Sequence, residues 1–464
     1  MSKKLSKNPP PIVFILVGLL SIWGWSKFQP SLTPKPETAS PRTPVSAISK
    51  PLRYRFSLGD KLLIHANATK AKQQGIAAFR QGNYAQATEY WESSLFDEPN
   101  DPETRIYLNN AAITNDAVQK IAVVVPIGSN LDVAQEMLRG VAQAQTEFNL
   151  LGGKLQVQIV NDENNSDIAK QVAQNLVRDS TILAVIGSNA SNASLAAAPI
   201  YQQGGLVMIT PTSTSGKLSN FGSYIFRAAP TNDDMANTLA EYTVKTAKRQ
   251  NVAICYDSQA PDNVTFKDAF IPALLAQGGS FINTQCDLAA PDFNAENSVN
   301  KLISSGAEAV LLAPHIDKLN RAVDLARANQ WKMSLLGTFS LNTSKITRSG
   351  QGDLNGVVLP VPFHPQQDSA QDFTAKAQKM WGEETMLTWR TATSYDATQA
   401  IASGLQSVNT RDSLQNALRN SDLAVIGANS QVEFLASGDR TIKSALVEVR
   451  ANPEQGYYFE LLKP

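Results

Sequence analysis

The chain has 464 residues, which at ~100–200 residues per domain is enough for about two to four domains. Its 41 lysines and arginines balance 41 aspartates and glutamates, so it lacks the basic surplus of a nucleic-acid-binding protein. A hydrophobic share of 43% indicates ordinary globular material. Two cysteines cannot build a disulfide scaffold, and His65, His315 and His364 lack metal-ligand spacing. We expect neither a metal nor another cofactor.

Residues 1–26 have the pattern of an export signal or a membrane anchor. Three lysines precede an apolar run from Ile12 to Trp25. As a helix this run is about 22 Å long, which is short for a ~30 Å hydrocarbon core. Gly24-Trp25-Ser26 is an indifferent cleavage site, and tryptophans suit a membrane interface. Cleavage and retention as an anchor therefore both stay open.

Residues 27–52 carry six prolines and predict a semi-extended spacer. A signal or anchor followed by such a spacer places the folded part outside the cytoplasm. We expect a periplasmic protein that is either tethered to the inner membrane or released after signal cleavage.

Residues 53–115 predict a small α-helical hairpin module. From Lys70 onward the sequence resembles one 34-residue tetratricopeptide unit, in which small residues lie where two antiparallel helices touch. The matching positions are Gly75, Phe79, Gly82, Tyr84, Ala87, Trp91, Leu95 and Pro99. Such units normally need about three neighbours, so this one must pack on the rest of the chain or on a partner. An ordinary helical hairpin without a partner is the alternative.

After Asn115 short apolar strands alternate with amphipathic helices, which is the pattern of parallel sheets covered on both faces. Strands are expected to begin near Ile121, Leu155, Ile182, Leu206, Val252, Phe281, Ala309 and Met333. Helices are expected at Leu131–Phe148, Asp167–Arg178, Ser191–Gln202, Val264–Ala276, Ala295–Ser304 and Leu319–Asn329. Two such series predict an α/β fold with two doubly wound parallel-sheet lobes.

In open parallel sheets, ligands bind at the carboxyl ends of the strands. In the first series these ends run into hydroxyl-rich segments, Ser188–Ser191 and Thr210–Ser215. A helix begins near Ser191, where free N–H groups favour an anion such as a carboxylate. In the second series the strand ends run into Asp257–Asp262, His315 and Thr338–Ser340. Each segment could also be a plain N-cap or turn, and the convergence of two loops favours a binding site.

Several segments resemble type I periplasmic solute-binding proteins of ABC transporters, in particular the leucine-binding-protein-like receptors for branched-chain amino acids and amides. They are Asn161-Asp162, Leu183–Ser219, Tyr224–Asp234, Gly356–Phe363, Ser394–Ile401 and Gly438–Arg440. The resemblance implies two lobes, joined by crossovers near Asp233, Pro360 and Ala428. The implied boundaries are 118–232 with 361–428 for lobe 1, and 233–360 with 429–464 for lobe 2.

The resemblance also implies how a ligand is held between the lobes. Hydroxyl donors to a ligand carboxylate fall on Ser191 and Thr214, with Thr212 beside them, and a cleft-lining aromatic falls on Tyr395. Together with the strand ends, the candidate ligand-binding residues are Ser188, Asn189, Ser191, Thr212, Thr214, Asp233, His315, Phe339 and Tyr395.

Two positions depart from the family's pattern. Amino-acid receptors place an acid after the strand that ends here at Gly337, where it pairs with the ligand's ammonium, but this chain has Phe339. The frequent aromatic after the strand near Val252 is replaced by Pro261-Asp262. An unpaired ammonium in a closed cleft is costly. Therefore Asp233, Asp257 or Asp262 takes over this role, or the ligand is not a standard α-amino acid.

No nucleophile elbow, phosphate loop or zinc-protease motif is present in the sequence, so we expect a binding protein and no enzyme. Cys255 and Cys286 lie in consecutive predicted strands, where both buried thiols and a disulfide are compatible with export.

The first hypothesis is an extracytoplasmic receptor that binds a small amino-acid-like carboxylate for an ABC permease or a sensor. The alternative is an envelope regulator that uses the same fold and the helical module for contact with a protein.

Overall fold

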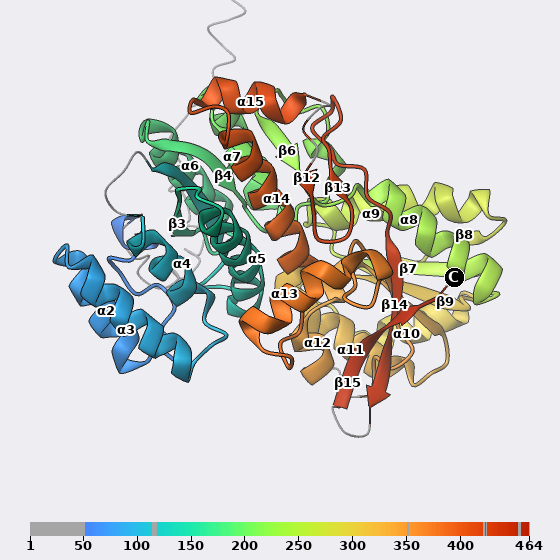
Figure 1. Ribbon diagram of the computed structural model, residues 1–464. Helices are drawn as coiled ribbons and strands as arrows, with labels where there is room; N and C mark the ends of the chain where they lie inside the picture. The colour runs from blue at the N-terminus through green and yellow to red at the C-terminus, as the bar shows by residue number, and fades with distance from the viewer. Residues whose placement is uncertain are drawn as a thin grey trace, which may run out of the picture. The chain divides into compact units, whose positions relative to one another are not determined.

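The computed structural model describes residues 52–113, 118–349, 352–420, 423, 425–452 and 456–463 (Figure 1). The expected export signal or anchor, and all but the last residue of the spacer, lie outside these residues. Within the described ranges, no helix combines the length and the apolar character that a membrane crossing requires.

The first sheet has the strand order β1-β3-β2-β4-β5-β6. Its strands are β1 (Phe56–Ser57), β2 (Gln119–Val125), β3 (Leu155–Asn161), β4 (Ile182–Ile186), β5 (Val207–Thr210) and β6 (Ile225–Arg227). All pairings are parallel except that of β1 with β3, in which Phe56 lies opposite Val160. The β-branched residues of β2 and β4 are buried, as expected for strands covered on both faces.

The second sheet has the order β15-β14-β11-β10-β9-β7-β8. Its strands are β7 (Asn251–Tyr256), β8 (Ser280–Ile282), β9 (Ala309–Ala313), β10 (Ser334–Gly337), β11 (Val358–Val361), β14 (Ala445–Asn452) and β15 (Gly456–Leu462). The strands from β8 to β11 are parallel, whereas β14 and β15 add an antiparallel edge. A two-stranded sheet of β12 (Val425–Ile426) and β13 (Gln431–Val432) completes the strands of the described residues.

Helices alternate with the strands of both sheets (Figure 1). The α-helices are α2 (Lys70–Arg80), α3 (Tyr84–Asp97), α4 (Pro102–Ala111), α5 (Leu131–Leu150), α6 (Ser166–Arg178), α7 (Ser191–Gln203), α8 (Asn232–Glu241), α9 (Pro261–Ala276), α10 (Ala295–Ser304), α11 (Leu319–Asn329), α12 (Ser344–Ser349), α13 (Gln371–Trp381), α14 (Trp389–Leu405) and α15 (Arg411–Arg419). The short helical turns are η1 (Leu52–Arg55), η2 (Gly216–Leu218), η3 (Tyr242–Thr246), η4 (Ile316–Lys318), η5 (Phe339–Leu341) and η6 (Asp368–Ala370).

This architecture confirms the predicted fold class, a mixed α/β fold with two mainly parallel sheets, as in the type I periplasmic binding fold. All eight expected strands and all six expected α/β helices are present, and α10 and α11 have the predicted bounds. The short β6 and the hairpin β14–β15 were not anticipated, because three residues carry little periodicity and a hairpin breaks the βα alternation.

Helices α5 and α14 pack closely, although about 250 residues separate them in the chain (Figure 1). A Cβ atom on Gly140 of α5 would lie 2.1 Å from the carbonyl oxygen of Thr391 and 2.7 Å from the amide nitrogen of Tyr395. Only glycine permits this approach. The α5–α14 contact fixes where the first turn of α14 lies.

The segment before β2 packs against β3. The amide of Asn110 in α4 pairs with the backbone of Val157, accepting from its N–H at 2.9 Å and donating to its carbonyl at 2.8 Å. The strand β1 pairs with the same edge, and Arg55 forms an ion pair with Glu163 at 2.8 Å. Residues 52–113 therefore cover the side of β3 that faces away from β2, and β1 is the short edge strand.

Helices α2 and α3 pack around Trp91, which is fully buried. A Cβ on Gly75 would lie 2.3 Å from the indole nitrogen of Trp91, so the helices meet through a glycine. The buried Lys72 pairs with Asp101 and Glu103, each at 2.7 Å. Although burial opposes it, the carboxylates of Glu103 and Asp101 raise the pKa of Lys72. The classification of these helices as tetratricopeptide-like stays a prediction.

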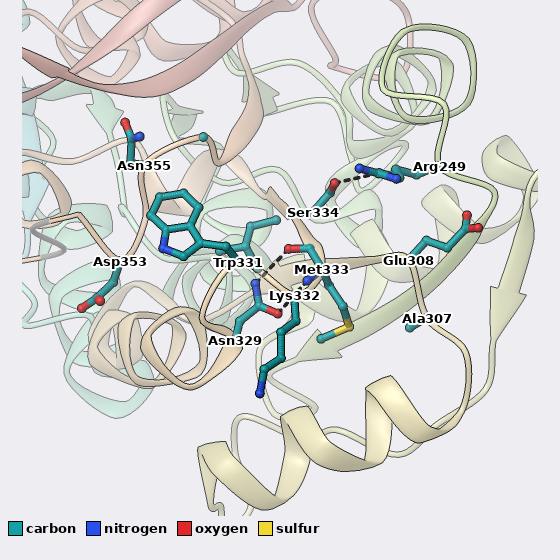
Figure 2. Close-up of a pocket in the computed structure, with 12 residues that line it drawn as sticks. Arg249, Ala307, Glu308, Asn329, Trp331, Lys332, Met333, Ser334, Asp353 and Asn355 are labelled. Carbon is teal, nitrogen blue, oxygen red and sulfur yellow. Dashed lines mark hydrogen bonds between the residues drawn. The ribbon is translucent and has the colours of Figure 1, made fainter.

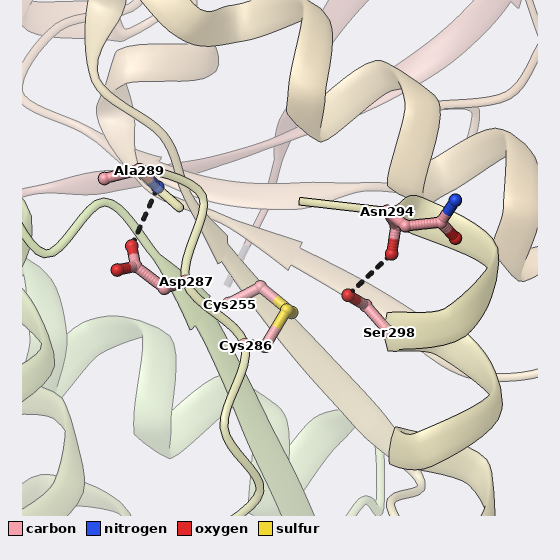
Figure 3. Close-up of a disulfide and its surroundings, with 6 residues drawn as sticks. All are labelled: Cys255, Cys286, Asp287, Ala289, Asn294 and Ser298. Carbon is pink, nitrogen blue, oxygen red and sulfur yellow. Dashed lines mark hydrogen bonds between the residues drawn. A yellow bond between two sulfur atoms is a disulfide. The ribbon is translucent and has the colours of Figure 1, made fainter. Parts of the chain in front are cut away.

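A disulfide joins Cys255 at the end of β7 to Cys286 in the segment after β8 (Figure 3). Beside it, the carboxylate of Asp287 accepts hydrogen bonds from the N–H groups of Ser258 at 3.1 Å and Ala289 at 2.7 Å. These contacts hold the carboxyl end of β7 in place. Of the two states that the sequence allowed for the cysteines, the structure has the disulfide.

We predict that removing this disulfide lowers stability by about 3–4 kcal/mol, because it closes a loop of 31 residues. The test is urea unfolding of the double variant Cys255→Ala/Cys286→Ala against wild type. A thiol assay on unreduced, denatured protein should find no free thiol, and reductant should release two. Two free thiols before reduction would contradict the disulfide.

Candidate functional site

A small cavity lies at the carboxyl ends of strands from both sheets. It is lined by Asn189, Ala190, Ser191, Thr212, Asp262, His315, Ile316, Phe339, Ser340, Trp389 and Arg390. The lining residues follow β4 and β5 of the first sheet, follow β9 and β10 of the second, and begin α9 and α14. The cavity measures about 20 Å³, which is roughly the space that one water molecule needs.

The first-sheet side of the cavity is the N-terminus of α7. Its N-cap is Ala190, and no side chain caps the helix. Ser191 is therefore the first helical residue and not the N-cap that the sequence allowed. The first N–H groups of an uncapped helix lack intrahelical acceptors, and together with the helix dipole they attract an anion.

Hydrogen bonds tie the two hydroxyl-rich loops together beneath this helix end. The carbonyl of Asn189 accepts from the hydroxyls of Thr212 at 2.8 Å and Ser213 at 3.2 Å. The carbonyl of Ser188 accepts from Thr210 at 3.0 Å and Ser194 at 3.2 Å. The predicted convergence of the two loops is confirmed, and it places Asn189, Ser191 and Thr212 on one wall.

Thr214 lies in the same loop but does not line the cavity. Its hydroxyl oxygen is buried and has no hydrogen-bond partner among the described residues. A buried hydroxyl without a hydrogen-bond partner lowers stability. The hydroxyl of Thr214 is such a group among the described residues.

The second-sheet side supplies one carboxylate and one imidazole. Asp262 is the second residue of α9, and His315 follows β9. Burial raises the pKa of Asp262, and the nearby His315 only partly opposes this rise. The imidazole Nδ1 of His315 accepts from the N–H of Asp317 at 3.3 Å, which orients the ring.

Aromatic side chains close the cavity. Phe339 is 3% exposed and packs edge-on against Trp389, with 5.5 Å between the ring centroids. It also contacts the ring of Phe266 at 6.2 Å. The indole N–H of Trp389 is buried without a partner among the described residues. At the position where the resemblance implies an acid, this chain has an apolar wall.

Arg390 brings a buried cation to the same cavity. Its guanidinium lies 4.6 Å above the ring of Trp389 and 3.6 Å from the carboxylate of Glu136 in α5, and it donates to the carbonyl of Asn342 at 2.6 Å. Burial lowers the pKa of Arg390, although Glu136 opposes this shift. Burial likewise raises the pKa of Glu136, against the effect of Arg390. The pair is thus desolvated on both sides.

Five of the nine predicted site residues line this cavity, namely Asn189, Ser191, Thr212, His315 and Phe339. Ser188 and Thr214 are buried in the adjoining loops. Asp233 is exposed and lines a different pocket. The hydroxyl of Tyr395 donates to Glu147 in α5 at 2.7 Å, on the side of α14 that packs against α5.

Trp389 and Arg390 were missing from the sequence-based candidates. The available signal was an uncommon Trp-Arg pair just before the Ser394–Ile401 segment, but only the packing of α14 brings it to the strand ends. Of the three acids considered for an ammonium, only Asp262 lines the cavity, since Asp257 is buried against Lys318 at 2.8 Å.

Buried ion pairs connect the short motifs that carried the resemblance. Arg227 in the Tyr224–Asp234 segment pairs with Asp439, and Asp396 in α14 pairs with Arg440. Burial raises the pKa of Asp396, although Arg440 opposes the shift. These motif residues hold the segment after β13 against β6 and α14, and they do not line the cavity.

A family model described as periplasmic binding protein matches residues 118–452. The chain belongs to this family. Membership implies a location outside the cytoplasm and agrees with the two parallel-dominated sheets.

The relatives that the chain matches include amino-acid-binding proteins. The chain is 26% identical over 245 residues to the leucine-specific-binding protein of Salmonella typhimurium. The aligned region covers 52% of this chain but only 66% of that protein. It is 25% identical over 308 residues to the Leu/Ile/Val-binding protein of Escherichia coli, and this aligned region covers 64% of this chain and 81% of that protein. A solved ABC transporter substrate-binding protein from Desulfitobacterium hafniense, 25% identical, superposes with a TM-score of 0.63 over 75% of this chain and all of that one.

We predict that Arg390→Met destabilises the protein by about 3–5 kcal/mol, because it leaves the carboxylate of Glu136 buried without its cation. The double variant Glu136→Gln/Arg390→Met should recover part of this loss. The matched control is Lys376→Met, which breaks an exposed pair with Asp372 and should cost less than about 1 kcal/mol. Urea unfolding measures all four proteins, and equal losses for Arg390→Met and Lys376→Met would contradict the prediction.

Proposed function

We propose that this periplasmic binding protein is the receptor of an ABC transporter for a small amino-acid-like carboxylate, and that the ligand binds at the cavity between the two sheets. The observation that carries the proposal is the composition of that cavity. An uncapped helix end, one carboxylate, one imidazole and two aromatic rings meet at the carboxyl ends of the strands, together with the guanidinium of Arg390, whose charge Glu136 balances. This combination suits a zwitterion with an apolar side chain.

In this proposal the ligand carboxylate binds at the N-terminus of α7. The N–H groups of the first turn and the hydroxyl of Ser191 are the donors, and Thr212 and Asn189 complete the wall. The ammonium pairs with Asp262, which takes over from the acid that Phe339 replaces. Phe339 and Trp389 then contact the apolar part of the ligand.

The size of the cavity implies movement. About 20 Å³ cannot hold an amino acid, so the walls must separate when a ligand enters. We propose that they belong to two lobes, formed by residues 118–232 with 361–428 and by residues 233–360 with 429–464. Contacts that such an opening would break include the hydroxyl of Ser344 to Asp132 at 3.3 Å and the Arg390 bond to Asn342.

The expected partner of the closed receptor is an ABC permease or a sensor, with the N-terminal residues as the export signal or anchor. A second candidate function is that of an envelope regulator that binds a protein through α2 and α3. The feature that favours it is Phe96 at the end of α3, which is 89% exposed and lies between the acidic residues Glu92 and Asp97. It does not require a ligand.

We expect leucine, isoleucine or valine, or a related amino acid or amide, to raise the melting temperature of the wild-type protein. The change Ser191→Ala should weaken binding about 10- to 100-fold, because it removes a hydrogen bond to a charged carboxylate worth ~1.5–3 kcal/mol. Ser298→Ala in the exposed part of α10 is the control and should bind as wild type does. Isothermal titration calorimetry measures the affinities. If no compound binds, the receptor proposal fails and the regulator is favoured.

Ligand affinity should increase with pH through the raised pKa of Asp262. Below that pKa the carboxyl group is protonated and has no charge to pair with the ammonium, whereas above it the ion pair forms. The pH range in which affinity changes therefore lies above about 3.9, the ordinary pKa of an aspartate. Titrations at pH 4.5–7.5 should give a flat and weaker profile for Asp262→Asn, and the wild-type profile for Asp233→Asn. A flat wild-type profile would exclude Asp262 as the ammonium partner.

A further inference from the structure

A second and larger pocket opens at the other end of the second sheet, at the amino ends of its strands (Figure 2). It measures about 420 Å³. Its lining residues lie just before β7, β9 and β11 and around the start of β10, and they include Arg249, Glu308, Trp331, Lys332, Asp353 and Asn355. The family's ligands are expected at the opposite, carboxyl edge, so this pocket is separate from the proposed receptor site.

Trp331 is the conspicuous residue of this pocket. Its side chain is 65% exposed, whereas Trp91, Trp381 and Trp389 are buried. Its backbone has a φ of +63°, directly after Gln330 with a φ of +48°. A bulky residue in the left-handed region is unfavourable by roughly 1–2 kcal/mol, and exposure gives it no compensating burial. Neither the backbone conformation nor burial favours a tryptophan here, which points to a role in binding.

The polar side chains around the indole are spread over several loops and are partly held in place. Arg249 donates to the hydroxyl of Ser334 at 2.9 Å, and the Glu308 carboxylate accepts from the backbone N–H of Gln250 at 2.7 Å. Asp353 accepts from Arg327 at 3.0 Å. In Figure 2, Trp331 lies between Asp353 and Asn355 on one side and Arg249 with Ser334 on the other.

The charges of the pocket cancel. Arg249 and Lys332 are cationic, and Glu308 and Asp353 are anionic. The side-chain oxygen of Asn355 is buried and has no hydrogen-bond partner among the described residues. A phosphate-bearing ligand would be repelled by the two carboxylates, and no charge of one sign dominates to select an ion. The pocket suits a neutral ligand with many hydroxyl groups and one apolar face.

We propose that this pocket binds a carbohydrate, with the apolar face of a pyranose ring stacked on the indole of Trp331. The exposed indole offers a flat apolar surface, and amphipathic aromatic rings suit ligands that are apolar on one side and wet on the other. Asp353 and Glu308 accept hydrogen bonds from sugar hydroxyls. The site is independent of the proposed receptor function, because none of its residues lines the first cavity.

The experiment follows tryptophan emission of the wild-type protein, because Trp331 is the exposed tryptophan of the described residues. The affinities of all variants are measured by isothermal titration calorimetry and co-sedimentation, which do not need the indole. The probes are N-acetylglucosamine, cellobiose and chitotriose as free sugars, and cellulose, chitin and purified cell-wall sacculi in co-sedimentation as polymers. We expect at least one probe to shift the emission or to sediment the protein. Trp331→Ala should weaken this binding at least tenfold, and Asp353→Ala should weaken it severalfold. Tyr54→Ala, which removes a partly exposed aromatic in η1, should bind as wild type does.

A stability measurement separates a binding role from a structural one. Trp331→Gly should melt at or above the wild-type temperature, because glycine accepts the positive φ without strain. Binding of free sugars and polymers alike identifies a saccharide pocket, and binding of polymers alone identifies a glycan-chain site. The proposal is overturned if no probe binds or if Trp331→Ala binds as tightly as wild type. A photo-cross-linking residue placed at position 331 gives a further check, and capture of protein alone would also overturn the proposal.

Discussion

The close packing of α5 against α14 is the contact on which the candidate site depends. At Gly140 the two helices approach so closely that a methyl group would collide with the backbone of α14 at 2.1 Å. The contact is reinforced where Tyr395 donates to Glu147 at 2.7 Å and where Thr388 donates to Glu136 at 2.7 Å. Because α14 is fixed along its length, its first turn delivers Trp389 and Arg390 to the strand ends.

The same packing makes the cavity electrostatically demanding. Glu136 of α5 faces Arg390 of α14, and both are almost fully removed from water. If α14 moved relative to α5, Arg390 and Glu136 would separate and each charge would stay buried without its partner. Such a movement would therefore be energetically unfavourable. Any opening of the site is more easily accommodated at the contacts of Arg390 and Asp132 with residues 342–348. Rigid support on one wall and breakable contacts on the other suit a receptor that closes on its ligand.

The two edges of the second sheet have different chemistry. Its carboxyl edge combines Asp262, His315 and Phe339 with the helix end of α7, which is suited to a zwitterion. Its amino edge exposes Trp331 among balanced charges, which is suited to a neutral polar ring. A parallel sheet separates its two edges by the length of its strands, so the two proposed sites lie apart.

Much of the fold could be predicted from the sequence because apolar runs such as Ile121–Val125 and Ala309–Ala313 have the length and composition of buried strands. The loops Ser188–Ser191 and Thr210–Ser215 could be placed together because they follow adjacent parallel strands, whose carboxyl ends meet at one edge of the sheet. Local pattern did not suffice for Tyr395. Its segment resembles the family's pattern, but its hydroxyl donates to Glu147, a partner about 250 residues away.

The sequence by itself thus determined the α/β class, the strand-end loops and the hydroxyl wall around Ser191, because these follow from local periodicity and strand direction. Tertiary structure decided which acid joins that wall, since Asp233, Asp257 and Asp262 look alike in the sequence and differ only in where their helices and loops point. It also decided that Arg390 and Trp389 line the cavity, that Cys255 and Cys286 are bridged, and that Trp331 is left exposed. Those outcomes depend on contacts between distant segments, which no local pattern encodes.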